Sequence, residues 1–419
     1  AGDNPTIAAL HETHPLRDGI SPSQPQRFKV ERPKSSFAAW YQFFPRSEGA
    51  TIDPNTGKII QGTLKTSMAG LERAAAEGFD IVYLPPVFPI GVTNRKGRNN
   101  TLVAGPDDPG SPFGIGSELG GHDTVDPLLG TMDDFKALCQ RAHELGLEIA
   151  LDFALQCSPD HPWVKAHPNW FRHKPDGSIA FAENPPKKYQ DIYPIDFNAD
   201  MPGIEKEVER IMNLWIEAGV TIFRIDNPHT KPVRFWQDVI AAVTKKHPEI
   251  LFLAEAFTRP GMMRALSYVG FTQSHCYFPW RNTKDELEEY LPVTNGDDGY
   301  YQHNTFWPTT PDILTAYVRD NGVAGAGSHG LAVLGYLQRL RTHREQAAPR
   351  LRRADRQREV RGQGSRLEQG QAVRRGRDGA HRHCRARARR RNHPRLNTAG
   401  RGRHDGTDNQ TGGDPRFHP

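Results

Sequence analysis

Residues 221–229 read Thr-Ile-Phe-Arg-Ile-Asp-Asn-Pro-His, an apolar run that carries an arginine and then an aspartate at its far end. A second apolar run, 250–254, leads to Glu255 in the same way, and one amphipathic segment of helical length separates the two runs. Buried strands that alternate with helices are typical of a parallel sheet, whose strands all end at one edge. The sequence therefore predicts that Asp226 and Glu255 lie side by side at that edge.

The same alternation of apolar strand and amphipathic helix extends in both directions along the chain. Predicted strands cover 37–44, 81–87, 149–154, 220–225, 250–254, 274–278 and 305–308, and predicted helices cover 62–78, 132–145, 204–218, 233–246, 261–269, 284–291 and 312–318. About seven strand–helix units of this α/β kind favour a (β/α)8 TIM-type barrel that is incomplete in this chain. The active site of such a barrel lies at the C-terminal ends of its strands.

Three regions lie outside this alternation. Residues 1–35 are polar and rich in proline, so we expect a linker that leads into a catalytic barrel of residues 36–320. Residues 155–201 carry aromatic side chains among prolines and predict a subdomain inserted after the third strand, on the face where long loops usually bind substrate. Residues 321–419 form an arginine-rich tail for which we predict disorder.

The tail also dominates the charge of the chain. From Leu331 onward it holds 23 arginines, no lysine and 8 acidic residues, so the 330 residues before it carry a net charge of −10 although the whole chain carries +5. An acidic body does not predict a nucleic-acid partner. Arginine richness without lysine is what out-of-frame translation of a GC-rich gene produces, and we interpret the tail as the result of a frameshift between about 320 and 330; a nucleic-acid-binding arm is the alternative. Sequencing of the coding DNA decides between them.

Other classes of protein find little support. The four cysteines, Cys139, Cys157, Cys276 and Cys384, are scattered without CxxC spacing, which favours free thiols in a reducing, cytoplasmic compartment. No secretory signal is visible near the N-terminus, and no apolar run reaches the roughly 18 residues of a membrane span. The pair His122-Asp123 and His161 lack the spacing of a metal site, so we expect neither a metal nor a cofactor.

Two carboxylates at neighbouring strand ends suit retaining glycosyl transfer, which needs a nucleophile and a proton donor roughly 5 Å apart. We predict Asp226 as the nucleophile and Glu255 as the general acid and base. Arg224 points to the same side of its strand as Asp226 and can keep it ionised. The apolar strand around Glu255 should favour the protonated form that a donor needs. The alternatives are an aspartate that caps the next helix and a glutamate that pairs with a nearby cation.

Longer runs of sequence resemble a known family. Residues 151–163 read Leu-Asp-Phe-Ala-Leu-Gln-Cys-Ser-Pro-Asp-His-Pro-Trp, 226–232 read Asp-Asn-Pro-His-Thr-Lys-Pro, and 184–194 and 254–260 are similarly distinctive. These runs resemble the maltose-1-phosphate maltosyltransferases of bacterial α-glucan synthesis, within the α-amylase superfamily (glycoside hydrolase family 13). The resemblance extends from about Phe37 to Tyr317.

The resemblance implies further site residues. Asp312 matches the third family carboxylate, which hydrogen-bonds sugar hydroxyls, although Thr309 stands where the family usually has asparagine; a helix-capping aspartate is the alternative. The positions that contact the donor sugar or its phosphate in the family are matched by Lys96, Gln156, Lys187, Tyr189 and Asn227. A lysine beside a phosphate makes physical sense as a point charge. The alternative for each of them is a solvated loop residue.

The reaction implied is transfer of maltosyl units from α-maltose 1-phosphate to the non-reducing end of an α-1,4-glucan, with release of phosphate. One alternative is a hydrolase or transglycosylase acting on starch-like glucans. Another is an inactive remnant that only binds glucan, because the eighth strand and the family's N- and C-terminal β-domains are not recognisable. Full-length members are homodimers, a state that we do not expect this chain to keep.

Overall fold

The computed structural model describes residues 4–14, 30–296, 298–300, 302–310 and 313–322. Its main feature is a seven-stranded sheet in which every neighbouring pair of strands is parallel. In spatial order the strands are β1 (Trp40–Gln42), β4 (Ile81–Leu84), β5 (Glu148–Phe153), β10 (Ile222–Asp226), β11 (Leu251–Glu255), β12 (Gln273–Ser274) and β13 (His303–Asn304). Spatial order follows chain order, so the chain winds in one direction, as in a (β/α)-barrel. The predicted fold class is confirmed.

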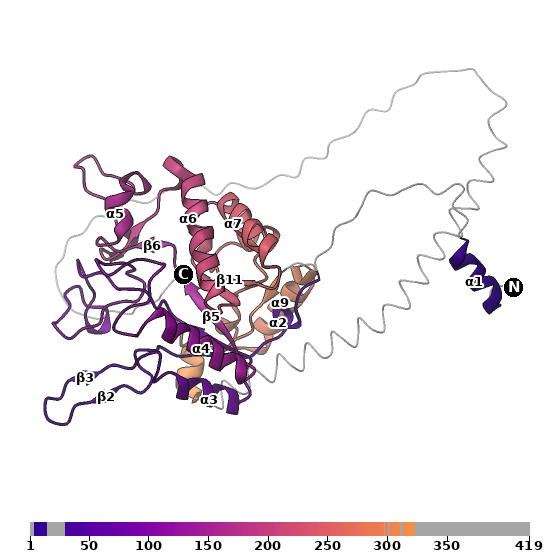
Figure 1. Cartoon of the computed structure of the whole chain (residues 1–419), viewed down its shortest axis with the longest axis horizontal. Helices are drawn as coiled ribbons and strands as arrows, with labels where there is room; N and C mark the ends of the chain where they lie inside the picture. The colour runs from indigo at the N-terminus through magenta and orange to yellow at the C-terminus, as the bar shows by residue number, and fades with distance from the viewer. Residues whose placement is uncertain (1–3, 15–29, 297, 301, 311–312, 323–419) are drawn as a thin grey trace, which may run out of the picture. The chain divides into compact units, whose positions relative to one another are not determined.

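Helices connect successive strands and cover the sheet from outside, as α4, α6 and α7 do in Figure 1. The connecting helices are α3 (Met68–Ala76), α4 (Met132–Glu144), α6 (Phe197–Glu217), α7 (Val233–Lys246), α8 (Pro260–Tyr268) and α9 (Lys284–Asn295), and a helical segment spans 316–322. Single turns of 3-10 helix are η1 (Arg98–Asn100), η2 (Pro168–Trp170), η3 (Pro228–Thr230), η4 (Phe278–Trp280) and η5 (Asp298–Tyr300).

The sheet has two different faces because side chains alternate along each strand. Its outer face and the helices share the large apolar core, to which β10 contributes Phe223 and Ile225. The inner face carries a small apolar layer that includes Ile81, Ala150, Ile222 and Leu251. Polar side chains follow this layer toward the C-terminal ends of the strands, so the inner face changes from apolar to charged along its length.

The sheet curls until its first and last strands approach each other. The rings of Trp40 in β1 and Trp307, just after β13, lie 5.2 Å apart. The amide of Gln273 donates to the carbonyl of Ser35 at 2.9 Å, and His303 lies 3.6 Å from Glu31. Within the described residues β1 and β13 each pair with one strand only. The barrel therefore has seven strands there, and β1 and β13 face each other without pairing.

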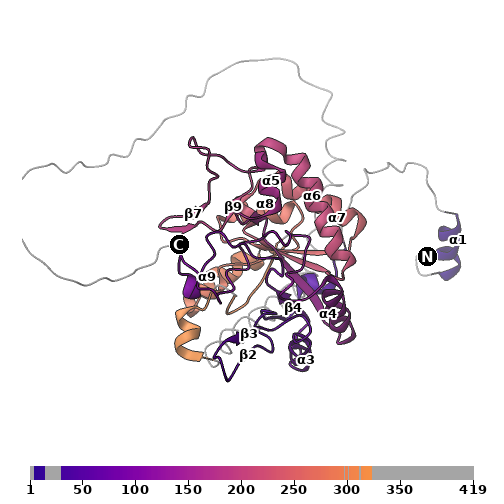
Figure 2. The same ribbon diagram turned by 60° about the vertical axis from the view of Figure 1, so that its left-hand side comes forward.

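The long connection after β5 contains short elements that hold loops at the C-terminal rim. These are β6 (Gln156–Cys157), which pairs with β9 (Tyr193–Pro194), α5 (Pro162–Ala166), and the hairpin of β7 (Ala182–Asn184) and β8 (Lys187–Tyr189). A second hairpin, β2 (Thr51–Ile52) with β3 (Ile59–Ile60), follows β1 and extends from the lower edge of the view in Figure 2. Both β7–β8 and β6–β9 lie on the side where the barrel strands end.

Some boundaries differ from the sequence prediction. The last strand is 303–304 rather than 305–308, because two polar residues, and not the apolar run after them, make the ladder. Helix α6 begins at Phe197, seven residues earlier than predicted, with a break in helical geometry at Asp200. The linker region contains two helices that were not predicted, α1 (Pro5–Thr13), capped by Asn4, and α2 (Pro33–Ser36).

No helix in the described ranges is long and apolar enough to cross a bilayer. From residue 323 onward, the tail for which we predict disorder lies outside the residues that the structure describes.

Two histidines fasten the loops to the end of β5. The backbone N–H of Trp163 donates to Nδ1 of His161 at 3.0 Å, so His161 carries its proton on Nε2 and donates to Nδ1 of His122, also at 3.0 Å. His122 in turn donates from Nε2 to the carbonyl of Ala154 at 2.9 Å. This chain of bonds uses both rings in the neutral form, and burial lowers the pKa of His122 to about 4.

We predict that acid destabilises the fold through His122. Because its pKa in the folded protein lies below the ordinary value of 6.5, the unfolded chain binds the proton first, and stability is lost as the pH falls from about 6.5 toward 4. Between pH 6.5 and pH 5, protonation of His122 should lower the free energy of unfolding by about 2 kcal/mol. Urea unfolding of His122→Gln should show a shallower loss than the parent protein, whereas the control His143→Gln, on the exposed side of α4, should keep the parent's slope. Equal slopes in all three proteins would contradict this prediction.

Candidate active site

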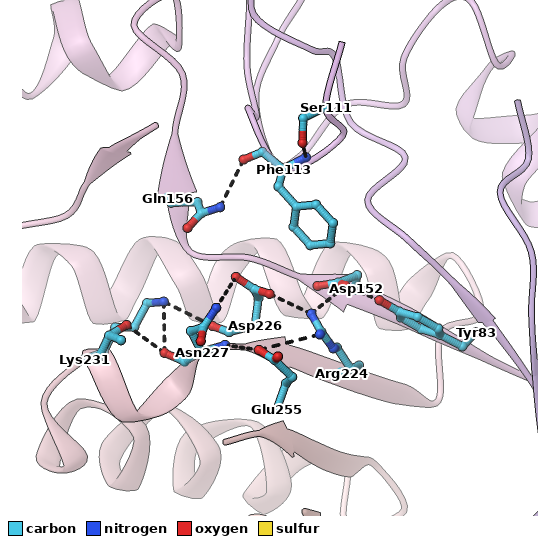
Figure 3. A network of polar contacts seen from close by, with 11 residues as sticks. Tyr83, Ser111, Phe113, Asp152, Gln156, Arg224, Asp226, Asn227, Lys231 and Glu255 are labelled. Carbon is cyan, nitrogen blue, oxygen red and sulfur yellow. Dashed lines mark hydrogen bonds and ion pairs between the residues drawn. The ribbon is translucent and has the colours of Figure 1, made fainter. Parts of the chain in front are cut away.

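Asp226 and Glu255 are the last residues of adjacent strands. They are register partners in the β10–β11 ladder and are 7% and 8% exposed. Residues paired in this way point to the same side of a sheet. Figure 3 shows the two carboxylates facing the same space at the mouth of the barrel. The structure thus brings the two predicted catalytic residues together.

Arg224 joins the two carboxylates from below. Its Nη1 donates to Oδ1 of Asp226 at 2.8 Å, and its Nη2 lies 3.6 Å from Oε2 of Glu255. The side chain is 2% exposed, so these ion pairs are shielded from water. One planar guanidinium therefore fixes both carboxylates relative to each other.

A third carboxylate, Asp152 of β5, lies deeper in the same network. It is fully buried, and its Oδ2 accepts hydrogen bonds from Nη1 of Arg224 at 2.9 Å and from the hydroxyl of Tyr83. Burial raises the pKa of Asp152 to about 8, while Arg224 opposes that rise. Burial also raises the pKa of Tyr83 well above its usual value, so the phenol keeps its proton.

The turn after β10 adds a second cation, which is half-buried. Asn227 adopts left-handed backbone angles (φ 45°, ψ 52°), which asparagine tolerates, and its N–H donates to Oε2 of Glu255 at 3.0 Å. The ammonium of Lys231 donates to the carbonyls of Asp226 and Asn227 at 3.1 and 3.2 Å. The network thus sets two cations, Arg224 and Lys231, against three carboxylates (Figure 3).

Glu255 is not in the apolar surroundings that its strand neighbours suggested. Leu253 and Ala254 are buried, but the carboxylate itself meets the N–H of Asn227 and the guanidinium of Arg224. The strand sequence did not show this because these partners come from another strand and from a turn. Both partners favour the ionised form of Glu255 when no substrate is bound.

Above the network lies a cavity of about 1190 Å³ between the strand ends and the connection after β5. The residues predicted from the sequence that line it are Asp226, Glu255, Lys96, Gln156, Lys187, Tyr189 and Asn227. Arg224 lies beneath the cavity floor, and Asp312 lies outside the described residues. A cavity of this size fits a disaccharide-sized ligand.

The basic residues of the cavity differ in their surroundings. Lys96 is 5% exposed, donates to Oε1 of Gln190 at 3.1 Å and lies 3.7 Å from Asp191, so its charge is partly balanced. Lys187, on the β7–β8 hairpin, is exposed and lines the cavity, and within the described residues it makes no ion pair. Its neighbour Lys188 pairs with Glu183 at 3.8 Å and does not line the cavity.

Gln156 and Tyr189 come from short strands of the connection after β5. The amide of Gln156 donates to the carbonyl of Phe113 at 3.1 Å, which holds its side chain over the carboxylates (Figure 3). Within the described residues no group of three or more histidine, cysteine or acidic side chains is arranged to hold a metal ion.

Sequence reasoning missed two members of the network. Tyr83 faces the barrel interior from β4, and its position two residues after the inward-facing Ile81 was the available signal. Lys231 is half-buried and hydrogen-bonded to the turn after β10, although it stands within the run 226–232 that carried the family resemblance.

Known proteins share much of this sequence. The chain is 80% identical over 334 residues to the α-1,4-glucan:maltose-1-phosphate maltosyltransferase of Bifidobacterium animalis subsp. lactis. The aligned region covers 80% of this chain and 46% of that enzyme. The enzyme of the same name from Arcanobacterium haemolyticum is 55% identical over 321 residues, with 76% and 46% covered. The chain thus spans about half the length of the curated relatives it matches. No family model matches it.

Among solved structures, an α-amylase from Lactobacillus plantarum superposes with a TM-score of 0.51 at 26% identity, over 64% of this chain and 61% of that one. This likeness agrees with the barrel topology.

We predict that Arg224 is essential for stability. Removing it leaves three carboxylates around an unfilled buried space, so Arg224→Met should lower the free energy of unfolding by about 3–5 kcal/mol. The exposed ion pair of Arg73 with Glu48, at 2.6 Å, provides the control, and Arg73→Met should cost about 1 kcal/mol or less. Chemical denaturation of both variants measures the difference, and similar losses would show that the buried network does not carry the stability assigned to it.

Proposed function

The chain belongs to the family of the α-1,4-glucan:maltose-1-phosphate maltosyltransferases, and we propose that its cavity catalyses retaining transfer of a maltosyl unit from α-maltose 1-phosphate to an α-1,4-glucan. The observation that supports this most directly is the pairing of Asp226 and Glu255 around Arg224 at the floor of a cavity that also contains lysines. Inverting enzymes separate their carboxylates to admit a water, whereas adjacent strand ends favour the closer spacing of retaining ones.

In the proposed first step a carboxylate oxygen of Asp226 attacks the anomeric carbon, and the bond from that carbon to the phosphate oxygen breaks. Glu255 gives its proton to the departing phosphate, and a β-maltosyl ester of Asp226 remains. Arg224 supports this step because its hydrogen bond to Oδ1 holds the carboxylate of Asp226 in place. Binding of the donor excludes water from Glu255 and brings a phosphate dianion beside it, and both changes favour the protonated form that the step needs.

In the proposed second step Glu255, now ionised, removes the proton from the 4-hydroxyl of the glucan's non-reducing end. The hydroxyl oxygen attacks the anomeric carbon from the opposite face, the ester bond to Asp226 breaks, and an α-linkage forms. The N–H of Asn227 and Nη2 of Arg224 support the ionised Glu255 between the two steps. Asp312 is proposed as the third carboxylate, which binds hydroxyls of the sugar ring.

We propose that the basic rim of the cavity selects the phosphate-bearing donor. Lys96 and Lys187 line the same cavity as the carboxylates, and Lys187 brings a positive charge with no carboxylate beside it among the described residues. Gln156 and Tyr189 supply hydrogen-bonding groups for the sugar hydroxyls. A hydrolase acting on neutral starch-like glucans gains nothing from such charges, which is why phosphate dependence separates the two functions.

We also infer a place in bacterial α-glucan or glycogen synthesis and a cytoplasmic location. Cys139, Cys157 and Cys276 are buried free thiols in the described part of the chain, as is usual in a reducing compartment.

The first test of this function is release of phosphate. Incubation of the chain with α-maltose 1-phosphate and glycogen should release inorganic phosphate, and Asp226→Asn should reduce the rate at least about 1,000-fold because no ester can form. Phosphate is measured colorimetrically, with glycogen omitted as the control for simple hydrolysis. Equal phosphate release with and without glycogen would indicate a hydrolase, and an unchanged rate in Asp226→Asn would remove Asp226 as the nucleophile.

The second test concerns the donor's phosphate. Lys187→Met should raise KM for α-maltose 1-phosphate about 10-fold to 100-fold, the range expected for loss of one hydrogen bond to a charged group. Lys188→Met is the matched control, because this neighbouring lysine points to Glu183 instead. KM for α-maltosyl fluoride, a donor without phosphate, should change little in either variant. Equal effects of Lys187→Met on both donors would show that Lys187 does not read the phosphate.

A further inference from the structure

Tyr83 lies inside the barrel, one strand beyond Asp152 and away from the cavity. It belongs to the inner apolar layer, where it is 5% exposed, and its hydroxyl donates to Oδ2 of Asp152. The pKa of the phenol is raised by burial, so the hydroxyl acts as a donor throughout the ordinary pH range. Tyr83 does not line the cavity and has no part in the two steps proposed above.

Asp152 depends on this donor more than an exposed carboxylate would. Its Oδ2 accepts from Tyr83 and from Nη1 of Arg224, whereas its Oδ1 is buried without a hydrogen-bond partner in the described part of the molecule. Full burial disfavours its charge, and the pKa of about 8 places its ionisation just above neutral pH. Two donors on one oxygen are therefore the contacts that favour the carboxylate over the acid.

The charge of Asp152 matters to its neighbours because they share one guanidinium. Arg224 pairs with Asp152, Asp226 and Glu255 at 2.9, 2.8 and 3.6 Å. The other titratable groups around this network are Lys231, beside the nucleophile, His229, whose pKa is lowered by burial, and His275, which is buried and neutral with its pKa lowered to about 3. When Asp152 is neutral, more of the positive charge of Arg224 acts on the two catalytic carboxylates.

We propose that Tyr83 is a positioning residue that favours the ionised form of Asp152 and thereby sets how strongly Arg224 acts on Asp226 and Glu255. Loss of its hydroxyl keeps Asp152 neutral to higher pH. The uncompensated guanidinium then favours ionised Glu255, which removes the proton donor of the first step. The effect on Asp152 rests on its burial and on the two hydrogen bonds to its Oδ2, and the effect on catalysis rests on the proposed function.

The effect on Asp152 is tested by stability, without any activity. Tyr83→Phe removes only the hydroxyl oxygen. Tyr290→Phe is the matched control, because the hydroxyl of Tyr290 is partly buried and lies away from the three carboxylates, where it accepts from the N–H of Tyr277 at 3.1 Å. Urea unfolding of both variants and the parent is measured at pH 6.5 and pH 9. At pH 6.5 Asp152 is protonated in both the parent and Tyr83→Phe. At pH 9 Asp152 of the parent is ionised and accepts a hydrogen bond from the Tyr83 hydroxyl, and Tyr83→Phe lacks this bond.

The unfolding constant of Tyr83→Phe is compared with that of the parent at each pH. We expect the ratio of variant to parent to be about five times larger at pH 9 than at pH 6.5. The destabilisation by Tyr290→Phe stays constant. In an Asp152→Asn background, where no charge can form, the pH-dependent part of the Tyr83→Phe effect should vanish. A Tyr83→Phe penalty that is the same at both pH values, or that keeps its pH dependence in the Asp152→Asn background, would overturn the proposal.

The effect on catalysis is read from the pH profile of maltosyl transfer from α-maltose 1-phosphate. Tyr83→Phe should move the alkaline limb of kcat/KM to lower pH by about one pH unit, with no shift in Tyr290→Phe. If the destabilisation by Tyr83→Phe depends on pH but the alkaline limb of its kcat/KM profile does not move, the proposed effect of Tyr83 on catalysis is wrong. Absence of transfer in the parent chain would count against the proposed function, while the stability measurement would still decide the role of Tyr83.

Discussion

The rest of the site depends on one buried guanidinium. Arg224 stands where three strands end and touches a carboxylate from each of them: Asp152, Asp226 and Glu255. Placing a charge there costs several kcal/mol in desolvation, and only close contact with opposite charges offsets that cost. The arrangement therefore has few alternatives, since a shift of any strand by one residue would turn its carboxylate to the outer, apolar face.

The fold supplies this constraint through the parallel sheet. The inner face begins with an apolar layer that fills the barrel, continues with Tyr83, Asp152 and Arg224, and ends with the carboxylates that face the cavity. Each layer packs on the one below, so the strands themselves hold Arg224 and the carboxylates in place. The loops carry the remaining task of surrounding a ligand, and the connection after β5 brings Gln156, Lys187 and Tyr189 to the cavity.

Much of this arrangement could be predicted from the sequence, and the failures have physical causes. Helix 233–246 and the strands on either side of it were predictable because local periodicity determines them. The pairing of Asp226 with Glu255 followed from the rule that parallel strands end at one edge. Tyr83 and Lys231 escaped notice because their roles depend on neighbours brought close by curling of the sheet and by a left-handed turn. The last strand was misplaced because its two ladder residues are polar and carry no hydrophobic signal.

The most direct test of the account is to trap the ester on the nucleophile. A 2-deoxy-2-fluoro-α-maltosyl fluoride reacts without help from a proton donor, and its ring fluorine slows the second step so that the ester accumulates. Mass spectrometry of a peptic digest should locate the fluoromaltosyl group on Asp226 in the parent chain and in Glu255→Gln, and nowhere in Asp226→Asn. A label on another carboxylate, or no label in the parent chain, would contradict the claim that Arg224 holds Asp226 as the nucleophile beside Glu255.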